Sequence, residues 1–530
     1  MTFPFRTKAL VSVAALALAA TLAGCSAGST KTVSEVTGNS TFQSAAVPSS
    51  SPDRSTAAPG EVTEDTHFDA GDLKWDAAAE TRLTLADSGS LAEGANAAAV
   101  SVSGGTVRIS AAGTYRVSGT LGDGQLVVDA PAKDPVRIIL DGAQIASSTG
   151  PAILVNEADE VLLHLAQGSS NAVSDAPDYA DTGADAPNAA IYSMADLAIA
   201  GEGALTVEGN YQDGIASKDG LVLDSGRVTV AAADDGIKGK NYVLVLGGNC
   251  TVTAAGDGIS STNDTDADRG WLHQYAGQLT VSAGDDGLKA QTALSISGGT
   301  AVVSDSTEAL EAADIHISGG TVNATASDDG LNAAGAAEDA QDAASPLGSR
   351  GGAQQAGDVH LAISGGSVTV NAEGDGLDSN GDIAISGGQI VVNGPAAGGN
   401  GSIDANGDVA VTGGVLAAAG SDSMAQGLGG SSTQGGLQVS LGSAVPAGTV
   451  IQVADSAGKL VATFVAGKPT ENLVYSAKDI ENGRSYTIST GGSAEVAAGL
   501  GAGSLDGAVP VATVTAGQYA SGLGGGPGGR

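Results

Sequence analysis

The chain has 530 residues, a formal net charge of −37 and only 22 basic residues. This charge argues against nucleic acid as a partner, and it means that an acidic polymer is repelled unless a cation intervenes. Glycine is abundant (81 residues) and aromatic residues make up only 3% of the chain, which suits a thin core of Val, Ile, Leu and Ala.

The N-terminal residues have the pattern of a secretory signal. A basic start and an apolar stretch at residues 9–20 precede Leu-Ala-Gly-Cys25, which has the form of a bacterial lipoprotein box. We therefore expect a signal peptide at residues 1–24 and lipidation of Cys25. This lipid would hold the protein on the extracellular face of the bacterial cell membrane, since no other stretch is long and apolar enough to span it.

Composition divides the remaining chain. Residues 25–66 are rich in Ser, Thr, Pro and Gly, which predicts a disordered tether. Residues 67–440 carry a repeat that is blurred at first and clean from about 213 to 420. Residues 441–518 lose the repeat and predict a small C-terminal β module or cap, which would cover the open end of a repeat array. We expect residues 519–530 to be a disordered, Gly-rich tail.

One repeated phrase organises the central region. A double glycine, alternating apolar residues and an acidic turn recur, as in GRVTVAAADDGIKG (226–239) and GSVTVNAEGDGLDS (366–379). Insertions at 263–269 and 335–358 explain the two long steps in an otherwise regular period of about 22 residues. The first apolar position of each copy is occupied by Val228, Cys250, Leu279, Ala301, Val322, Val368 and Ile390.

Alternation with period 2 is a strand signature, and nothing in the repeat has a helical period. About 22 residues with three short strands make one rung of a parallel β-helix, in which equivalent residues of rungs about 4.8 Å apart form ladders. We therefore predict an all-β chain, a parallel β-helix with a small C-terminal β module. Cys250 falls in an apolar column, so we expect a buried thiol without a disulfide partner.

The acidic turns are the strongest functional signal. Carboxylates about 5 Å apart repel by roughly 3 kcal/mol at an effective dielectric constant of 20, so a stack of them requires protonation or bridging cations. Oxygen ligands on a secreted protein favour calcium, although Asp-Gly pairs are also ordinary turn formers. The candidate ligands of these turns are Asp213, Asp234, Asp235, Asp257, Asp285, Asp286, Asp328, Asp329 and Asp375, with Glu308 near the same place in one rung.

The insertion at 263–269 is a second candidate calcium loop. Asp264, Asp266 and Asp268 alternate in the spacing of such a loop, but the bidentate Glu of an EF-hand is missing because Tyr275 stands there. Trp271 and Tyr275 follow at once, and they would either stack on a sugar ring or close a corner.

Lysines follow several acidic turns, among them Lys238 and Lys289. They would balance charge locally or, in an acid-sugar lyase, supply a base beside calcium. We include both with Trp271 and Tyr275 as candidate carbohydrate-binding residues. We identify no catalytic residues, because the sequence contains no nucleophile elbow, phosphate loop or cysteine cluster.

With these motifs in order, residues 75–440 resemble a bacterial carbohydrate-binding domain family founded on a cell-surface protein of a cellulose-degrading clostridium. The resemblance rests on GTYRVSGTL (113–121), NAAIYSMADLAI (188–199), DDGIKG, NDTDADRG and the repeated ISGG. It implies a right-handed parallel β-helix that binds calcium and plant cell-wall-like polysaccharides, including acidic ones. It also implies a shape like that of pectate lyases without established lyase activity. Two rungs, at 304–312 and 394–406, lack the Asp-Gly turn, which puts calcium sites there in doubt.

The sequence thus predicts a lipid-anchored extracellular protein that binds polysaccharide with calcium, and no enzyme activity. Two alternatives remain open. One is a calcium-dependent polysaccharide lyase, and the other is a structural or adhesin-like surface spacer that calcium only stiffens.

Overall fold

The computed structural model describes residues 66–131, 133–183, 186–334, 357–396 and 398–519, which belong to one compact unit, Ser50–Arg530. The expected signal peptide, Cys25, the tether up to residue 65 and residues 520–530 of the expected tail lie outside them. No helix in the described part of the chain is long and apolar enough to cross a membrane.

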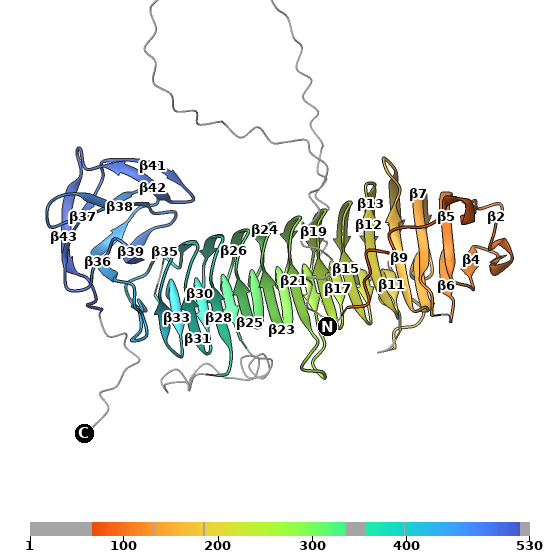
Figure 1. Cartoon of the computed structure of the whole chain (residues 1–530), viewed down its shortest axis with the longest axis horizontal. Coiled ribbons are helices and arrows are strands. Elements are labelled where there is room, and N and C mark those ends of the chain that lie inside the picture. The colour runs from red at the N-terminus through yellow and green to blue at the C-terminus, as the bar shows by residue number, and fades with distance from the viewer. Residues whose placement is uncertain (1–65, 132, 184–185, 335–356, 397, 520–530) are drawn as a thin grey trace, which may run out of the picture. The chain divides into compact units, whose positions relative to one another are not determined.

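The repeat region is a parallel β-helix, as the sequence predicted (Figure 1). Each rung contributes one strand to each of three faces, which we call A, B and C, and each strand pairs in parallel with its equivalents in the neighbouring rungs. The acidic turn of each rung lies between its face A strand and its face B strand.

Face A consists of β10 (Ser170–Ser174), β13 (Ala204–Gly209), β16 (Arg227–Ala232), β19 (Asn249–Ala254), β22 (Gln278–Ser282), β24 (Thr300–Asp305), β26 (Thr321–Ala326), β29 (Ser367–Ala372), β32 (Gln389–Asn393) and β35 (Val415–Gly420). Face B consists of β4 (Thr106–Ile109), β6 (Gln125–Asp129), β8 (Ile153–Glu157), β11 (Ala189–Ser193), β14 (Asp213–Ser217), β17 (Ile237–Gly239), β20 (Ile259–Ser261), β27 (Leu331–Ala333), β30 (Leu377–Ser379) and β33 (Ile403–Ala405).

Face C consists of β1 (Thr81–Leu85), β9 (Glu160–Leu165), β12 (Asp196–Gly201), β15 (Gly220–Leu223), β18 (Tyr242–Val245), β21 (Trp271–Gln274), β28 (His360–Ile363), β31 (Asp382–Ile385) and β34 (Val409–Val411). Four longer strands turn a corner and serve two faces. These are β5 (Gly113–Leu121) and β7 (Val136–Ala146), on faces C and A, and β23 (Leu288–Ile296) and β25 (Leu310–Ile317), on faces B and C.

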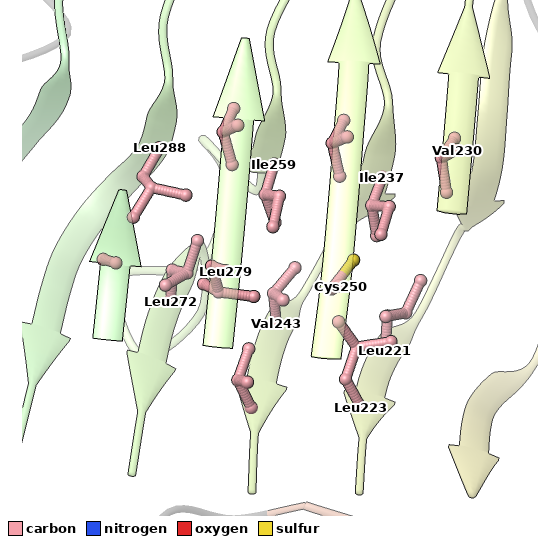
Figure 2. Close-up of a cluster of buried hydrophobic side chains, with 14 of the residues drawn as sticks. Leu221, Leu223, Val230, Ile237, Val243, Cys250, Ile259, Leu272, Leu279 and Leu288 are labelled. Carbon is pink, nitrogen blue, oxygen red and sulfur yellow. The ribbon is translucent and has the colours of Figure 1, made fainter. Parts of the chain in front are cut away.

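The column of apolar residues read from the sequence forms part of the core. Val228 pairs with Cys250, and Cys250 pairs with Leu279, so the seven inserted residues do not shift the register. Figure 2 shows Cys250 and Leu279 together with residues from faces B and C, such as Ile237 and Leu272, pointing into the same interior. The expected burial of Cys250 is confirmed, and this burial raises the pKa of its thiol to about 12.

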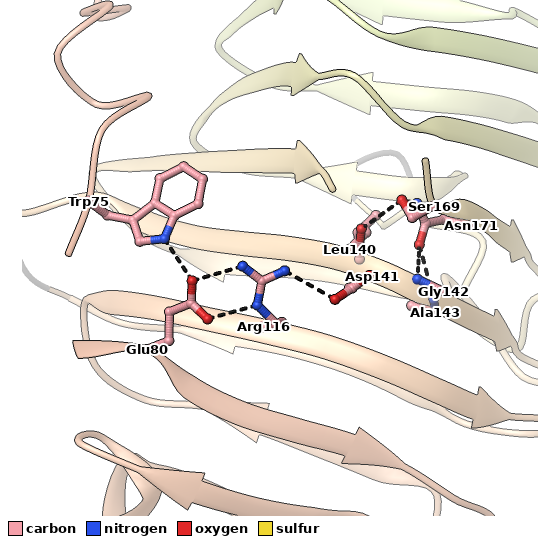
Figure 3. A network of polar contacts seen from close by, with 9 residues as sticks. All are labelled: Trp75, Glu80, Arg116, Leu140, Asp141, Gly142, Ala143, Ser169 and Asn171. Carbon is pink, nitrogen blue, oxygen red and sulfur yellow. Dashed lines mark hydrogen bonds and ion pairs between the residues drawn. The ribbon is translucent and has the colours of Figure 1, made fainter. Parts of the chain in front are cut away.

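The first rungs are joined by a polar network (Figure 3). The Arg116 guanidinium donates to both oxygens of Glu80, at 2.7 and 2.8 Å, and to Asp141 at 3.1 Å, while Trp75 Nε1 donates to Glu80 at 2.8 Å. These hydrogen bonds hold the pKa of Glu80 below its usual value. Around this network lie two short antiparallel strands, β2 (Leu91–Gly94) and β3 (Val100–Ser103), and two 3-10 turns, Ala77–Ala79 and Ala97–Ala99.

A small β module follows the last rung. Its strand β39 (Thr470–Ser476) pairs antiparallel with β35 of the helix and with β36 (Gly436–Val445), so the edge of the last face A strand is covered. Tyr519, assigned to the tail in the sequence analysis, packs against the core. The other six strands form an antiparallel sheet of β37 (Val450–Asp455), β38 (Leu460–Val465), β40 (Ser485–Thr490), β41 (Ser493–Ala497), β42 (Leu500–Ser504) and β43 (Val509–Thr515).

Substitution of Cys250 tests the column directly. Cys250→Ser places a hydroxyl in an apolar interior and should lower the free energy of unfolding by about 1–3 kcal/mol. Cys250→Val is the matched control, because Val already occupies this column at Val228, and it should cost less than about 1.5 kcal/mol. Urea denaturation measures both, and equal losses would contradict the assignment.

Candidate functional site

The register of face B brings carboxylates of seven successive rungs into one line. Ile215 pairs with Ile237, and the same apolar position continues through Ile259 to Leu377, so the residue two places earlier in each rung is also stacked. We call this line the acidic ladder. Its members are Asp213, Asp235, Asp257, Asp286, Glu308, Asp329 and Asp375.

Most ladder carboxylates have a structural task. One oxygen of Asp235 accepts a hydrogen bond from the backbone N–H of Asp257 at 2.9 Å, and Asp213 and Asp257 receive the N–H of the next ladder residue at 3.3 Å. Asp329 and Asp375 are bonded in the same way to the rungs that follow them. These hydrogen bonds stabilise the corner between faces A and B. They use one oxygen of each of these carboxylates but do not neutralise its negative charge.

The first residue of each doubled Asp is more exposed. Asp234, Asp285 and Asp328 lie on the surface beside the ladder. A side chain at Gly256, in the rung after the first pair, would meet the Asp234 and Asp235 oxygens at 2.7 and 2.6 Å. Gly374, in the rung after Asp328 and Asp329, is equally close to their oxygens, whereas Thr307 follows the pair Asp285 and Asp286, so glycine stands above a doubled Asp in two of three cases.

A second line of side chains runs beside the first, three residues further along each rung. We call it the mixed ladder, and it consists of Lys238, Ser260, Lys289, Glu311, Asn332, Asp378 and Asp404. The sequence analysis singled out the two lysines but missed Glu311, Asn332, Asp378 and Asp404. The sequence could have revealed them, because each stands three residues after the acidic-ladder position of its rung. Glu308, Glu311 and Asp404 belong to the two rungs that lack Asp-Gly.

In the first rungs the mixed ladder neutralises the acidic ladder. The Lys238 ammonium pairs with Asp235 and lies 3.5 Å from Asp213. Lys289 pairs with Asp286 at 2.7 Å and with Glu311 at 2.6 Å. Although burial lowers the pKa of each lysine, these carboxylates outweigh it and raise both pKa values, so the two amines stay protonated at neutral pH.

In the later rungs this compensation ends. Among the described residues, no lysine or arginine pairs with Glu308, Asp375, Asp378 or Asp404. Burial, and then neighbouring carboxylates, raise the pKa of Asp375 to about 7 and that of Asp378 well above its usual value. Burial also raises the pKa of Glu308 to about 8. These four carboxyl groups thus lack a paired basic side chain in the described part of the chain, whereas Glu373 nearby pairs with Lys468 at 2.8 Å.

The donor set of the later rungs fits a hard cation. Asn332 is buried, and its amide donates to Glu308 at 2.9 Å, while its Oδ1 atom has no hydrogen-bond partner among the residues that the structure describes. Asn332 stands between Glu311 and Asp378 in the mixed ladder. An unpaired amide oxygen among carboxylates is the kind of ligand that calcium takes.

Carboxylate oxygens already converge at two places beside Lys289. One oxygen from each of Asp257, Asp285 and Asp286 lies within 4.8 Å of the others, and the same holds for Asp286, Glu308 and Glu311. Calcium–oxygen distances of about 2.3–2.6 Å allow separations of this size. A cation here would share these oxygens with the Lys289 ammonium.

The structure does not gather the carboxylates of the insertion. Asp264, Asp266 and Asp268 are exposed, and they take part in neither convergence found among the described residues. Asp266 accepts the backbone N–H of Asp268 at 3.1 Å, and Asn263 Oδ1 accepts three hydrogen bonds from Thr265 and Asp266. The alternating spacing forms a local turn.

Trp271 begins β21 on face C and Tyr275 directly follows that strand, so both lie in a different line from Lys238 and Lys289. Trp271 stacks on Tyr242 with ring centroids 4.9 Å apart, and Tyr275 stacks on His273 at 3.9 Å. Both rings are half-buried and pack at the edge of an apolar cluster that Phe68 and Leu73 also touch. They retain exposed ring surface while closing this part of the face.

Comparison with known proteins identifies the family. The model of carbohydrate-binding domain-containing proteins matches residues 103–341. A carbohydrate-binding domain-containing protein of Acetivibrio thermocellus is 41% identical over 211 residues, which cover 39% of this chain and 74% of that relative. The chain belongs to this family. A solved structure of a polysaccharide lyase-like protein from C. thermocellum, a gadolinium derivative, is 30% identical and covers 46% of this chain and 94% of its own, with a TM-score of 0.41.

The raised pKa values predict an unusual pH dependence for the metal-free protein. Asp257 and Asp375, with pKa values of about 7, and Glu308, at about 8, keep protons in the folded state that the unfolded chain releases near pH 4. Their stabilisation is therefore present at low pH and lost as the pH rises through the folded values. In EDTA, the free energy of unfolding should therefore fall from pH 5 to pH 8, by up to about 1.4 kcal/mol per pH unit for each carboxyl that is protonated only in the folded state.

Denaturant titration at each pH measures this fall. The triple variant Asp257→Asn, Glu308→Gln, Asp375→Asn, which keeps the oxygens that accept N–H groups, should flatten it. Stability that rises from pH 5 to pH 8 in EDTA would contradict the prediction.

Proposed function

We propose that this protein is a lipid-anchored, extracellular polysaccharide-binding protein that uses calcium on face B to hold an acidic polysaccharide. Membership of the carbohydrate-binding family supports the general activity. One observation carries the finer proposal: among the described residues, no lysine or arginine pairs with Glu308, Asp375, Asp378 or Asp404.

Calcium is the cation that this donor set favours. Asp375, Asp378 and Asp404 offer carboxylate oxygens, Asn332 offers an unpaired amide oxygen, and softer nitrogen or sulfur donors are missing from this group. Asp329, the neighbour of Asp375 in the acidic ladder, adds negative charge close to Asp378. The chain's own residues would hold the ion, and the ion would supply the charge that Lys238 and Lys289 supply in the earlier rungs.

The same ion would recruit the polysaccharide. Calcium takes six to eight oxygen ligands, and a partly exposed group on a face leaves some of these positions to other oxygens. Sugar carboxylates and hydroxyls can occupy them, which resolves the repulsion between a chain of net charge −37 and a uronate polymer. Lys238, Lys289 and the exposed ring surface of Trp271 and Tyr275 are further candidate contacts.

A lyase reaction is less well supported. A lyase needs an unprotonated base near the acidic C–H bond of the sugar. Lys238 and Lys289 were the candidate bases, and the carboxylates bound to each of them keep the amines protonated. We therefore propose binding without catalysis, and the release of unsaturated uronides from any uronate polymer would contradict this.

The proposal predicts that millimolar calcium raises the melting temperature above its value in EDTA, and that polygalacturonate raises it further only with calcium present. The double variant Asp378→Asn, Asp404→Asn should lose most of both shifts. The matched control is Asp264→Asn, Asp268→Asn, which removes two charges from the exposed insertion and should keep them.

Two outcomes would contradict this assignment. A calcium shift lost only in the control variant would move the ion to the insertion. A calcium shift without any further shift or retention on a broad polysaccharide panel would favour the spacer function.

A further inference from the structure

A walled hollow lies at the N-terminal end of the acidic ladder. The chain between β10 and β11 leaves the rung at the same corner as the acidic turns, and Ala189, where it returns, pairs with Asp213, the first ladder residue. The hollow offers about 220 Å³, and its lining is mostly polar. We call it the end hollow; Asp181, Asn188, Tyr211, Gln212 and Lys218 border it.

The wall of the hollow is firmly anchored. Tyr179 is buried and donates a hydrogen bond to Asp175 at 2.8 Å, and its ring stacks on that of the lining residue Tyr211 with centroids 4.3 Å apart. Asp175 also accepts the backbone N–H of Asn210 at 2.5 Å. Asn188, on the other side, donates to Asp213 at 2.8 Å. These contacts fix Tyr211 and Asn188 before any ligand arrives.

Three polar groups of the end hollow have nothing to bind in the protein. Among the described residues, the Lys218 ammonium, the Gln212 amide and the Tyr211 hydroxyl have neither a hydrogen-bond nor an ion-pair partner. The Lys218 ammonium lies 5.8 Å from the centre of the Tyr192 ring. The Lys238 ammonium, by contrast, already forms ion pairs with two carboxylates of the acidic ladder. Lys218 is therefore a cation available to an external anion.

We propose that the end hollow binds the terminal sugar residue of an acidic polysaccharide and that Lys218 pairs directly with its carboxylate. This inference rests on the proposed function and adds a subsite to it that needs no calcium. The ring of Tyr211 supplies apolar contact to the pyranose, and Gln212, Asn188 and Asp181 supply hydrogen bonds to its hydroxyls. Such a mixture of an aromatic ring and a few convergent polar groups is typical of a sugar pocket.

The position of the hollow selects a chain end. A polysaccharide that follows the acidic ladder toward the N-terminal rungs meets the described lining residues Asp181 and Asn188 at the first ladder residue. The volume is below the roughly 300–1,000 Å³ of pockets that hold drug-sized ligands, so it suits one sugar residue. Internal residues of the chain would lie on the ladder, and only the last residue would enter the hollow.

Calorimetric titration of the purified full chain with digalacturonate in EDTA tests the proposal, because EDTA removes any contribution of calcium. We expect binding by the wild type, much weaker binding of the neutral dimer cellobiose, and a loss of about tenfold or more in affinity for Lys218→Met. Tyr211→Ala should also weaken binding. Lys240→Met is the matched control, since Lys240 is an exposed lysine one rung further on, and it should bind like the wild type.

Longer oligogalacturonates should bind in EDTA with the same affinity per chain as the dimer. An affinity that rises with the number of internal residues would overturn the end assignment. Digalacturonate binding that is absent, or unchanged in Lys218→Met, would overturn the site, while polygalacturonate retention in calcium would show that the proposed function stands without it. Digalacturonate binding without polymer retention in calcium would support the hollow and contradict the ladder function.

Discussion

Like charges stacked at a rung spacing of about 4.8 Å are the constraint on which this structure depends. A parallel β-helix repeats each side chain above its equivalent, so one acidic turn residue becomes a line of seven carboxylates. Backbone N–H groups of the following rungs satisfy one oxygen of several members. These hydrogen bonds do not neutralise the carboxylates. Burial and the neighbouring carboxylates therefore still raise the pKa values of Asp257 and Asp375.

The chain meets this constraint in two ways along one face. In the earlier rungs, lysines three residues after the ladder position provide the countercharge from within. In the later rungs the equivalent positions are occupied by Asn332, Asp378 and Asp404, which add oxygens in place of ammonium groups. We therefore propose that face B has a self-neutralised part and a part that needs an external cation, and that this cation also recruits the polysaccharide.

The sequence was sufficient for the architecture because the period is strict. Strand alternation, the 22-residue step and the apolar column through Cys250 all follow from residues that repeat, and the paired strands confirm them. The insertions were also separable, because they add length at corners without shifting the register.

The site was only partly predictable. The acidic turns could be recognised in the sequence because Asp-Gly recurs in them. The mixed ladder was not recognised, because its residues are of different chemical types and have only their position in the rung in common. Glu308 and Asp404 lie in rungs whose turns lack Asp-Gly, so a search for that motif undervalues them. The spacing of Asp264, Asp266 and Asp268 indicated a metal loop, whereas local backbone hydrogen bonds determine its conformation. The end hollow depends on a segment between β10 and β11 that has no repeat to mark it.

The most direct test of the account is the substitution Asp378→Lys, which places a lysine at the register position of Lys238 and Lys289. We predict that this variant melts at a higher temperature than the wild type in EDTA and that calcium no longer raises its melting temperature. A variant that is no more stable than the wild type in EDTA and keeps the full calcium shift would contradict the claim that the later rungs need an external cation.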